Sequence, residues 1–142
     1  MGPVFVDTWA WIALALKRDQ HHESAKTQHQ LFIGEGRPYV TSDFVVGELV
    51  TQLYRLLPAG QAEAFVKALL AACDAAHYKL VHVSPEQFQR AWQLRRQFDD
   101  KPGISFVDFL SMIVMQDLNL KDVFTGDADF QHVNLGFRLY PL

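Results

Sequence analysis

Pro3-Val4-Phe5-Val6-Asp7-Thr8 is the stretch that decides the architecture, because a short apolar run ends directly in an acid and a helix start. Short β-rich runs then alternate with longer helical segments to the end of the chain. After the first strand at 3–6, strands are predicted over 37–41, 79–83, 122–125 and 137–140, and helices over 8–18, 22–32, 43–57, 62–73, 85–98 and 105–119, with a turn or short helix over 127–130. This alternation predicts an α/β fold in which a mostly parallel sheet carries helices on both faces.

Local signals mark several of the helix boundaries. Ser84-Pro85-Glu86-Gln87 combines an N-cap serine, a proline suited to the first helical position and a glutamine placed for a capping box. Ser42 is a second N-cap candidate, and Pro58-Ala59-Gly60 is a predicted turn. Beyond that turn an apolar stripe with helical spacing is formed by Ala62, Phe65, Val66, Leu69 and Cys73.

Length and composition describe an ordinary globular chain. The 142 residues are 49% hydrophobic and 20% charged, which predicts one domain over 1–142 and excludes a disordered or fibrous protein. The single cysteine, Cys73, excludes an internal disulfide and a thiolate zinc cluster. The longest apolar run, Trp9 to Leu16, is far shorter than the ~20 residues of a membrane helix. We therefore expect a cytoplasmic protein.

Two acids stand where strands of the predicted sheet end. Asp7 directly follows the first strand, and Asp127 lies just beyond the strand at 122–125. In open α/β sheets ligands bind beyond the carboxyl ends of the strands, so both carboxylates are expected at one edge. The alternative is that each acid merely caps the helix that follows it.

Two further acids interrupt apolar runs. Glu48 and Asp108 are expected in the opening turns of helices that begin at the same edge of the sheet. A shielded, ionised carboxylate must be paired, protonated or bound to a metal, because burying it alone is costly. Asp108 has a simpler explanation in the capping-box spacing Ser105-x-x-Asp108. Glu48 would otherwise be a solvated residue with Arg55 as its charge partner.

Convergence of these acids would create a site made of carboxylate oxygens. The candidate ligands are Asp7, Glu48, Asp108 and Asp127. Oxygen ligands select a hard divalent cation such as Mg²⁺, which keeps several waters and binds substrate phosphate at its remaining positions. No histidine lies among the four, which argues against zinc. A net charge of −3 argues against a passive nucleic-acid binder, unless the acids are gathered around cations.

With these residues in view, the chain resembles the PIN-domain ribonucleases, and in particular the VapC toxins of toxin–antitoxin pairs. The resemblance spans essentially the whole chain and rests on Val6-Asp7-Thr8, Thr41-Ser42 with Glu48, Ser105-Phe106-Val107-Asp108, Thr125-Gly126-Asp127-x-Asp129-Phe130 and Gly136-Phe137-Arg138. Each motif is short, and their order along the chain carries the specificity.

The resemblance implies an α/β/α sandwich around a short parallel sheet, with a Mg²⁺- or Mn²⁺-dependent site that cleaves RNA phosphodiester bonds. The acids matching the metal-holding positions of the family are Asp7, Glu48, Asp108 and Asp127. Asp129 is a possible fifth metal ligand, which many relatives lack. Thr8 and Thr125 match hydroxyl positions that orient water or a carboxylate.

The resemblance also implies a homodimer and an antitoxin partner. The antitoxin is expected in an apolar groove formed by Leu53, Leu56, Leu57, Phe65, Val66 and Leu69. Simple packing of this helical hairpin within one subunit is the alternative. Two other functions stay open, a housekeeping PIN nuclease in RNA processing and a non-catalytic PIN-like binding module.

Substrate contacts are predicted at one basic stretch and one unusual aromatic residue. The candidates for RNA phosphate binding are Arg90, Arg95 and Arg96, with Lys101 nearby, although a solvated helix face would look the same. Trp9 departs from the family pattern, in which a small residue, often serine, follows the Asp-Thr pair. An indole at that place leaves the acids intact and bears on substrate preference.

Overall fold

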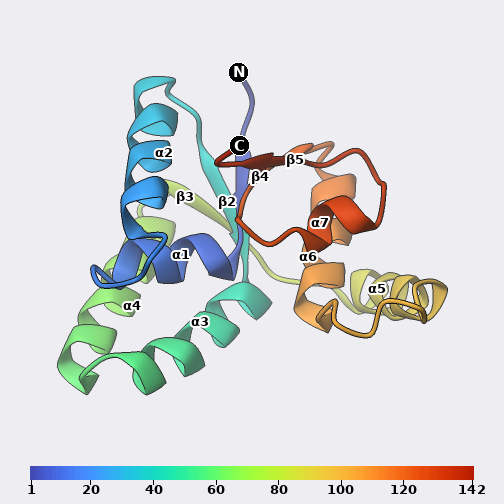
Figure 1. Ribbon diagram of the computed structural model, residues 1–142, viewed down its shortest axis with the longest axis horizontal. Coiled ribbons are helices and arrows are strands. Elements are labelled where there is room, and N and C mark those ends of the chain that lie inside the picture. Colours follow the sequence, from blue (N-terminus) through green and yellow to red (C-terminus); the bar gives the residue numbers. More distant parts are fainter.

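The computed structural model describes all 142 residues and contains a five-stranded sheet (Figure 1). The strands are β1 (Val4–Val6), β2 (Tyr39–Ser42), β3 (Tyr78–Val81), β4 (Asp122–Phe124) and β5 (Arg138–Tyr140). The helices are α1 (Thr8–Ala15), α2 (His22–Gly34), α3 (Asp43–Leu56), α4 (Ala59–Asp74), α5 (Pro85–Gln97), α6 (Phe106–Asp117) and α7 (Asp129–His132). The predicted succession of strands and helices is confirmed.

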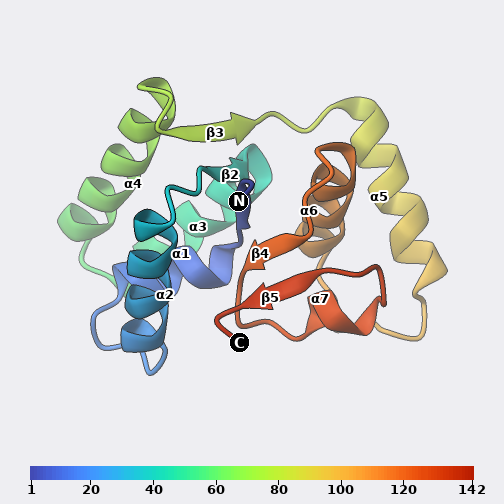
Figure 2. The same ribbon diagram turned by 90° about the horizontal axis from the view of Figure 1, so that it is seen from above.

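The sheet is parallel throughout, with the strand order β3-β2-β1-β4-β5. Figures 1 and 2 show α1, α2 and α4 on one side of it and α5 and α6 on the other. The predicted three-layer α/β/α arrangement is therefore confirmed. The chain moves outward from β1 to β2 and β3, and later resumes on the other side of β1 with β4 and β5. Such a change of direction leaves a crevice at the carboxyl ends of the central strands, where ligands bind in open α/β sheets.

Three serines cap the N-termini of helices α3, α5 and α6, and two of these helices begin at the crevice. Ser42 accepts a hydrogen bond from the Val45 amide, and Ser105 accepts one from the Asp108 amide. Ser84 forms the complete capping box with Gln87 that the sequence predicts. Because α3 and α6 begin where these caps place them, their first turns lie beside the carboxyl ends of the strands.

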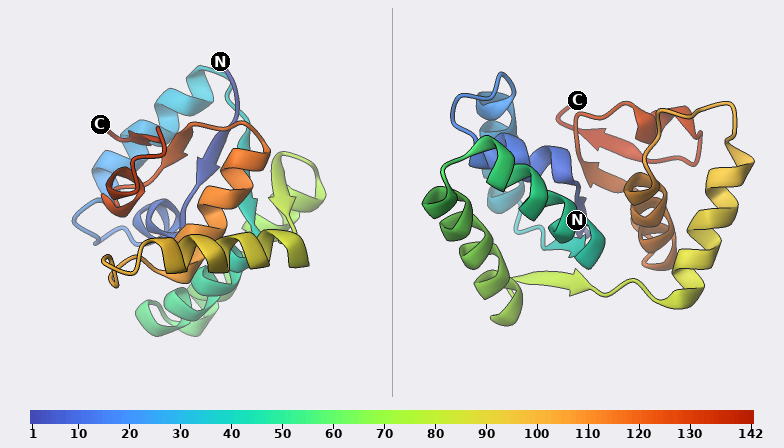
Figure 3. Two further views of the ribbon diagram at one scale, coloured as in Figure 1. Left: turned by 90° about the vertical axis from the view of Figure 1, so that its right-hand side faces the viewer. Right: turned by 90° about the horizontal axis from the view of Figure 1, so that it is seen from below.

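The central strands and α6 lie in the middle of the core, which buried residues of the other helices complete. All three residues of β1 and of β4 are buried, as are the eight consecutive residues Asp108–Met115 of α6. Figure 3 shows α5 lying across α6, and the contact includes the stacked rings of Phe98 and Phe109, 6.1 Å apart. A helix buried on all sides leaves little room for its first turn to move, so Asp108 is held on a rigid element.

Two helix boundaries differ from the prediction by three residues. Ala59 and Gly60 belong to the first turn of α4 rather than to a turn, because Pro58 at the N-cap leads directly into the helix. α1 ends at Ala15, three residues before the predicted end. None of the helices is both long and apolar enough to cross a bilayer.

A buried ion pair closes the amino end of the sheet. The Asp122 carboxylate accepts a hydrogen bond from Arg37 at 2.6 Å through one oxygen and from Arg138 at 2.6 Å through the other. Burial alone would raise the pKa of Asp122, and the hydrogen bonds from Arg138 and Arg37 outweigh it, so the pKa lies below its usual value. The side chains of Arg37 and Asp122 are only 5% and 9% exposed, whereas Arg138 is 63% exposed.

Replacing Asp122 by asparagine is expected to destabilise the fold, because it leaves the Arg37 guanidinium buried without a counter-charge. Removing one partner of a buried pair costs roughly 3–5 kcal/mol. Urea denaturation of Asp122→Asn should show a loss in that range. Arg138→Gln is the matched control, and its loss should stay below about 1 kcal/mol because the Arg138 side chain is largely exposed and Asp122 keeps its buried partner Arg37. Equal losses in the two variants would contradict this account.

Candidate active site

Asp7 is held at the carboxyl end of β1 by the neighbouring strand. Its Oδ2 accepts a hydrogen bond of 2.7 Å from the Thr125 hydroxyl, and both side chains are buried. Asp7 occupies the N-cap position of α1, yet its side chain makes no capping hydrogen bond. The capping alternative is therefore wrong for Asp7, whose carboxylate faces the crevice beside β4.

Asp127 is placed by the turn that follows β4. Its amide donates to the Thr125 hydroxyl oxygen at 3.1 Å, and its Oδ1 accepts from the Asp129 amide at 2.9 Å. Thr125 thus connects two acids, because its hydroxyl donates a hydrogen bond to Asp7 and accepts one from the backbone amide of Asp127. Part of the capping alternative is correct for Asp127, since one carboxylate oxygen organises the start of α7.

Asp108 projects from the first turn of α6. Its amide donates to Ser105, but the carboxylate does not complete a capping box. One carboxylate oxygen from each of Asp108, Asp127 and Asp129 can be chosen so that all three lie within 4.8 Å of one another. Asp129, predicted only as a possible fifth ligand, therefore belongs to the most compact group of acids in the site.

Glu48 closes the cleft from the side of α3. It is the sixth residue of that helix and lies in its second turn rather than the opening turn that was predicted. It forms no ion pair with Arg55, and it lines the same cleft as Asp7 and Asp108. The alternative of a surface residue paired with Arg55 is therefore wrong.

The cleft has a volume of about 310 Å³ and is lined by acids from five places in the chain. These are Asp7, Glu48, Asp108, Asp127 and Asp129. Burial, followed by the charges of the other four acids, raises the pKa of Asp108 to about 8. Burial also raises the pKa of Asp7 to about 6, although hydrogen bonds to its carboxylate oppose the rise. Like charges and poor solvation thus make simultaneous ionisation of Asp7 and Asp108 unfavourable.

The residues present fit a hard divalent cation. The donor set consists of carboxylate oxygens, as Mg²⁺ and Mn²⁺ prefer. Thr8, which lines the cleft, adds a buried hydroxyl with no hydrogen-bond partner in the chain. Buried polar atoms are normally satisfied, so an orphaned hydroxyl beside the acids suits a metal ligand or a metal-bound water. Thr125 does not line the cleft, but its hydroxyl contacts the Asp7 carboxylate and the Asp127 amide.

Trp9 forms one wall of the cleft and packs against the turn that carries Asp127. A Cβ atom built on Gly126 would lie 2.3 Å from Cζ2 of the indole, so no larger residue fits there without moving the ring. The indole also packs against the imidazole ring of His21, with the two ring centroids 5.1 Å apart. Trp9 therefore braces the turn between Thr125 and Asp127.

The predicted basic stretch does not form a free phosphate-binding face. Arg90 is engaged by Asp117 at 2.7 Å, and Arg95 donates to the carbonyl oxygens of Phe98, Lys101 and Ile104. These bonds arrange the loop that leads to Ser105, which explains Arg95 as a structural residue. Arg96 is exposed and forms no ion pair.

The cleft is also lined by four residues that the sequence did not indicate as site residues: Ile12, Gln52, Gly103 and Ser105. Ser105 was predicted only as a helix cap. Gln52 and Ile12 each follow a predicted site residue by four positions on the same helix, Glu48 and Thr8. A spacing of four residues places two side chains on the same face of a helix, so this spacing could have identified Gln52 and Ile12 as cleft residues. Gly103 gave no signal, because only the path of the loop brings it to the cleft.

The predicted antitoxin groove is wrong in part. Leu53 and Leu69 are buried in the core of the chain and line no groove. Leu56 and Leu57 instead line a cavity of about 640 Å³ together with Leu16 and Pro58, at the ends of α1 and α3. Lys17 and Arg18 also line it, which makes it an apolar cavity with a basic side.

Comparison with known proteins supplies independent information. Residues 4–135 match the family model described as PIN domain. The chain is 30% identical over 127 residues to the Mycobacterium tuberculosis protein named 23S rRNA-specific endonuclease VapC20, covering 89% of this chain and 91% of that protein.

Solved structures agree with the sequence match. The crystal structure of M. tuberculosis VapC20, described as a sarcin-ricin loop cleaving toxin, aligns with a TM-score of 0.80 at 29% identity, covering 95% of this chain and 96% of that one. VapBC2 from Rickettsia felis, bound to a promoter DNA fragment, aligns with a TM-score of 0.70 at 16% identity over 98% of this chain and 97% of that one. The second likeness shows the fold alone.

Neutralising Asp108 is expected to stabilise the metal-free protein. Its pKa of about 8 in the folded state lies above the unfolded value, so the folded state binds more protons and loses stability as pH rises from about 4 through 8. At pH 8 in EDTA, Asp108→Asn should melt at least 4 °C above wild type, about 1 kcal/mol for a domain near this size. The difference should shrink at pH 5.

The control for this melt is Asp99→Asn, which changes an exposed acid in the loop after α5 and should leave the melting temperature unchanged. Mn²⁺ should raise the melting temperature of wild type and of the control but not of Asp108→Asn. A lower metal-free melting temperature for Asp108→Asn would mean that the carboxylate acts as an ordinary helix cap.

Proposed function

The chain belongs to the PIN-domain family, and we propose that residues 1–142 form one PIN domain that acts as a divalent-metal-dependent endoribonuclease. The observation that carries the proposal is the convergence of five acids and one orphaned hydroxyl in a single cleft at the carboxyl edge of the sheet. The relative at 30% identity, whose name describes an rRNA endonuclease, supports RNA as the substrate.

Mg²⁺ or Mn²⁺ bound among these oxygens would lower the pKa of a bound water and stabilise charge that develops on the phosphoryl oxygens. Asp108, Asp127 and Asp129 are the residues best placed to hold it, because their oxygens form the compact group. Asp7 is oriented by Thr125, and Glu48 faces it from α3. The Thr8 hydroxyl is free to hold a water against this group.

We further propose that the enzyme is the toxin of a toxin–antitoxin pair and works as a homodimer. The VapBC complexes of similar fold support a protein partner. The cavity at Leu56 and Leu57 suits an antitoxin segment that carries apolar residues next to an acid, since Lys17 and Arg18 stand on its basic side. The exposed Phe88 and Trp92, one turn apart on α5, offer an apolar face for a second copy. A binding module without activity is disfavoured, because no acid of the site is missing.

RNA cleavage should require a divalent cation and the acids of the cleft. Asp7→Asn, Glu48→Gln, Asp108→Asn and Asp127→Asn each keep the side-chain shape and remove a charge. With purified ribosomal RNA and Mg²⁺ or Mn²⁺, each should lower kcat/KM by at least about a hundredfold, or roughly 2.7 kcal/mol. Asp129→Asn should mainly raise the metal concentration needed for half-maximal activity.

Mapping of the cut ends identifies the target, and EDTA should abolish every specific cut. Glu63→Gln, an exposed acid on α4, is the matched control and should cleave like wild type. Asp7→Asn that folds normally and cleaves at the wild-type rate would overturn the proposed function.

The partner cavity can be tested separately from catalysis. Leu56→Glu places a negative charge in an apolar wall, so it should abolish co-purification with a co-expressed antitoxin while RNA cleavage is kept. Tyr54→Glu is the control, because Tyr54 is equally exposed on α3 but lies outside the cavity. Co-purification that survives Leu56→Glu would place the partner elsewhere.

A further inference from the structure

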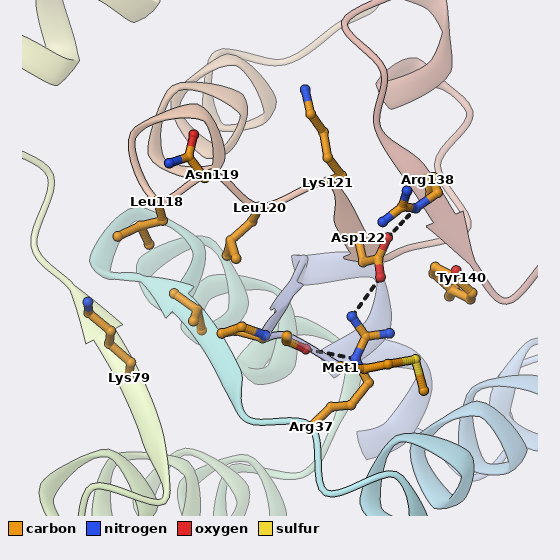
Figure 4. A pocket seen from close by; sticks show the side chains of 13 residues that line it. Met1, Arg37, Lys79, Leu118, Asn119, Leu120, Lys121, Asp122, Arg138 and Tyr140 are labelled. Carbon is orange, nitrogen blue, oxygen red and sulfur yellow. Dashed lines mark hydrogen bonds and ion pairs between the residues drawn. The ribbon is translucent and has the colours of Figure 1, made fainter.

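A second cavity lies at the amino end of the sheet, on the edge opposite the acids. It has a volume of about 570 Å³ and is lined by residues at the starts of β1, β2, β4 and β5 and by β3. Four cationic side chains line it, Arg37, Lys79, Lys121 and Arg138, against the single carboxylate of Asp122. Figure 4 shows Lys79 on the side of β3, and Lys121 and Arg138 on the side of β4 and β5.

The positive charge of this cavity is only partly neutralised by ion pairs within the chain. Asp122 neutralises one unit of charge and has both oxygens engaged by Arg37 and Arg138. Arg37, with a side chain only 5% exposed, uses Nε and Nη2 and leaves Nη1 without a partner in the chain. Lys79 forms no ion pair, and Lys121 donates only a long hydrogen bond of 3.3 Å to a carbonyl. In a chain of net charge −3, these groups form a local excess of positive charge.

We propose that this cavity binds a backbone phosphate of the RNA substrate at a distance from the cleavage site, an inference that rests on the proposed function. The catalytic cleft is lined by five acids, which repel a polyanion, so binding energy must come from cations elsewhere. The predicted stretch of Arg90 and Arg95 is engaged in the fold and does not supply it.

The two edges of the sheet are close enough for one RNA to reach both. The strands contain three or four residues, and a strand rises about 3.3 Å per residue, so the sheet is only roughly 10–13 Å deep. A folded RNA that enters the cleft can therefore place a flanking phosphate at the amino edge.

The test uses the two lysines, because neither forms an ion pair on which folding depends. Binding of a 30-nucleotide RNA hairpin is measured by fluorescence anisotropy in EDTA, over a range of salt concentrations. For the hairpin, the slope of log K against log salt should become shallower in Lys79→Gln/Lys121→Gln by roughly 0.7–0.9, the value for one lost phosphate contact.

Lys26→Gln/Lys67→Gln is the control, since it removes the same charge from exposed positions on α2 and α4. An unchanged hairpin slope in Lys79→Gln/Lys121→Gln, or an equal change in the control pair, would overturn the proposal. The assay needs no cleavage, so a wild type that binds as expected but cuts no RNA would contradict the proposed function and leave the phosphate site standing.

Discussion

The hydrogen bond from Thr125 to the buried carboxylate of Asp7 joins the carboxyl ends of β1 and β4, and the cleft depends on it. The same Thr125 oxygen accepts from the Asp127 amide, so one hydroxyl sets the distance between two acids that would otherwise separate. Two unit charges 4 Å apart repel by about 4 kcal/mol at an effective dielectric of 20. The carboxylates stay together because each is carried by an element anchored in the core, and the buried helix α6 resists movement of Asp108 most strongly.

The parallel sheet also separates charge along its short axis. Strand carboxyl ends carry the acids, and strand amino ends carry Arg37, Lys79, Lys121 and Arg138. Asp122 lies among these cations and does not cancel them. A polyanion that approached this surface would be attracted to the cationic edge and repelled by the acidic one.

Much of the fold was readable from the sequence, because its signals are local. The capping box at Ser84, the cap at Ser42 and the alternation of strands and helices each depend on neighbouring residues alone. The four predicted acids could be placed for a similar reason, since parallel strands deliver their carboxyl ends to a common edge. Asp129 was underrated because its carboxylate reaches the site through a turn whose path depends on Thr125 and Asp127.

Errors arose where exposure depends on distant parts of the chain. Leu53 and Leu56 lie on one helix with similar sequence surroundings, yet Leu53 is fully buried and Leu56 is 51% exposed. Arg95 looked like a surface cation in sequence, and the loop after α5 folds back onto it with three carbonyls. No local pattern distinguishes a guanidinium that will meet RNA from one that will organise a loop, because the loop's path is a tertiary property.

The raised pKa values connect the stability of the cleft to its chemistry. A carboxyl with a pKa of about 8 keeps its proton at neutral pH in the metal-free chain, which lowers the repulsion that Asp108 would otherwise suffer from the neighbouring acids. A cation that enters must displace that proton, so its apparent affinity rises with pH until the carboxyl is ionised without help. A divalent cation that bound only the folded state would also add stability, about 2.7 kcal/mol at a concentration of roughly 100 Kd. Its binding would therefore offset the repulsion among the carboxylates that the fold otherwise has to tolerate.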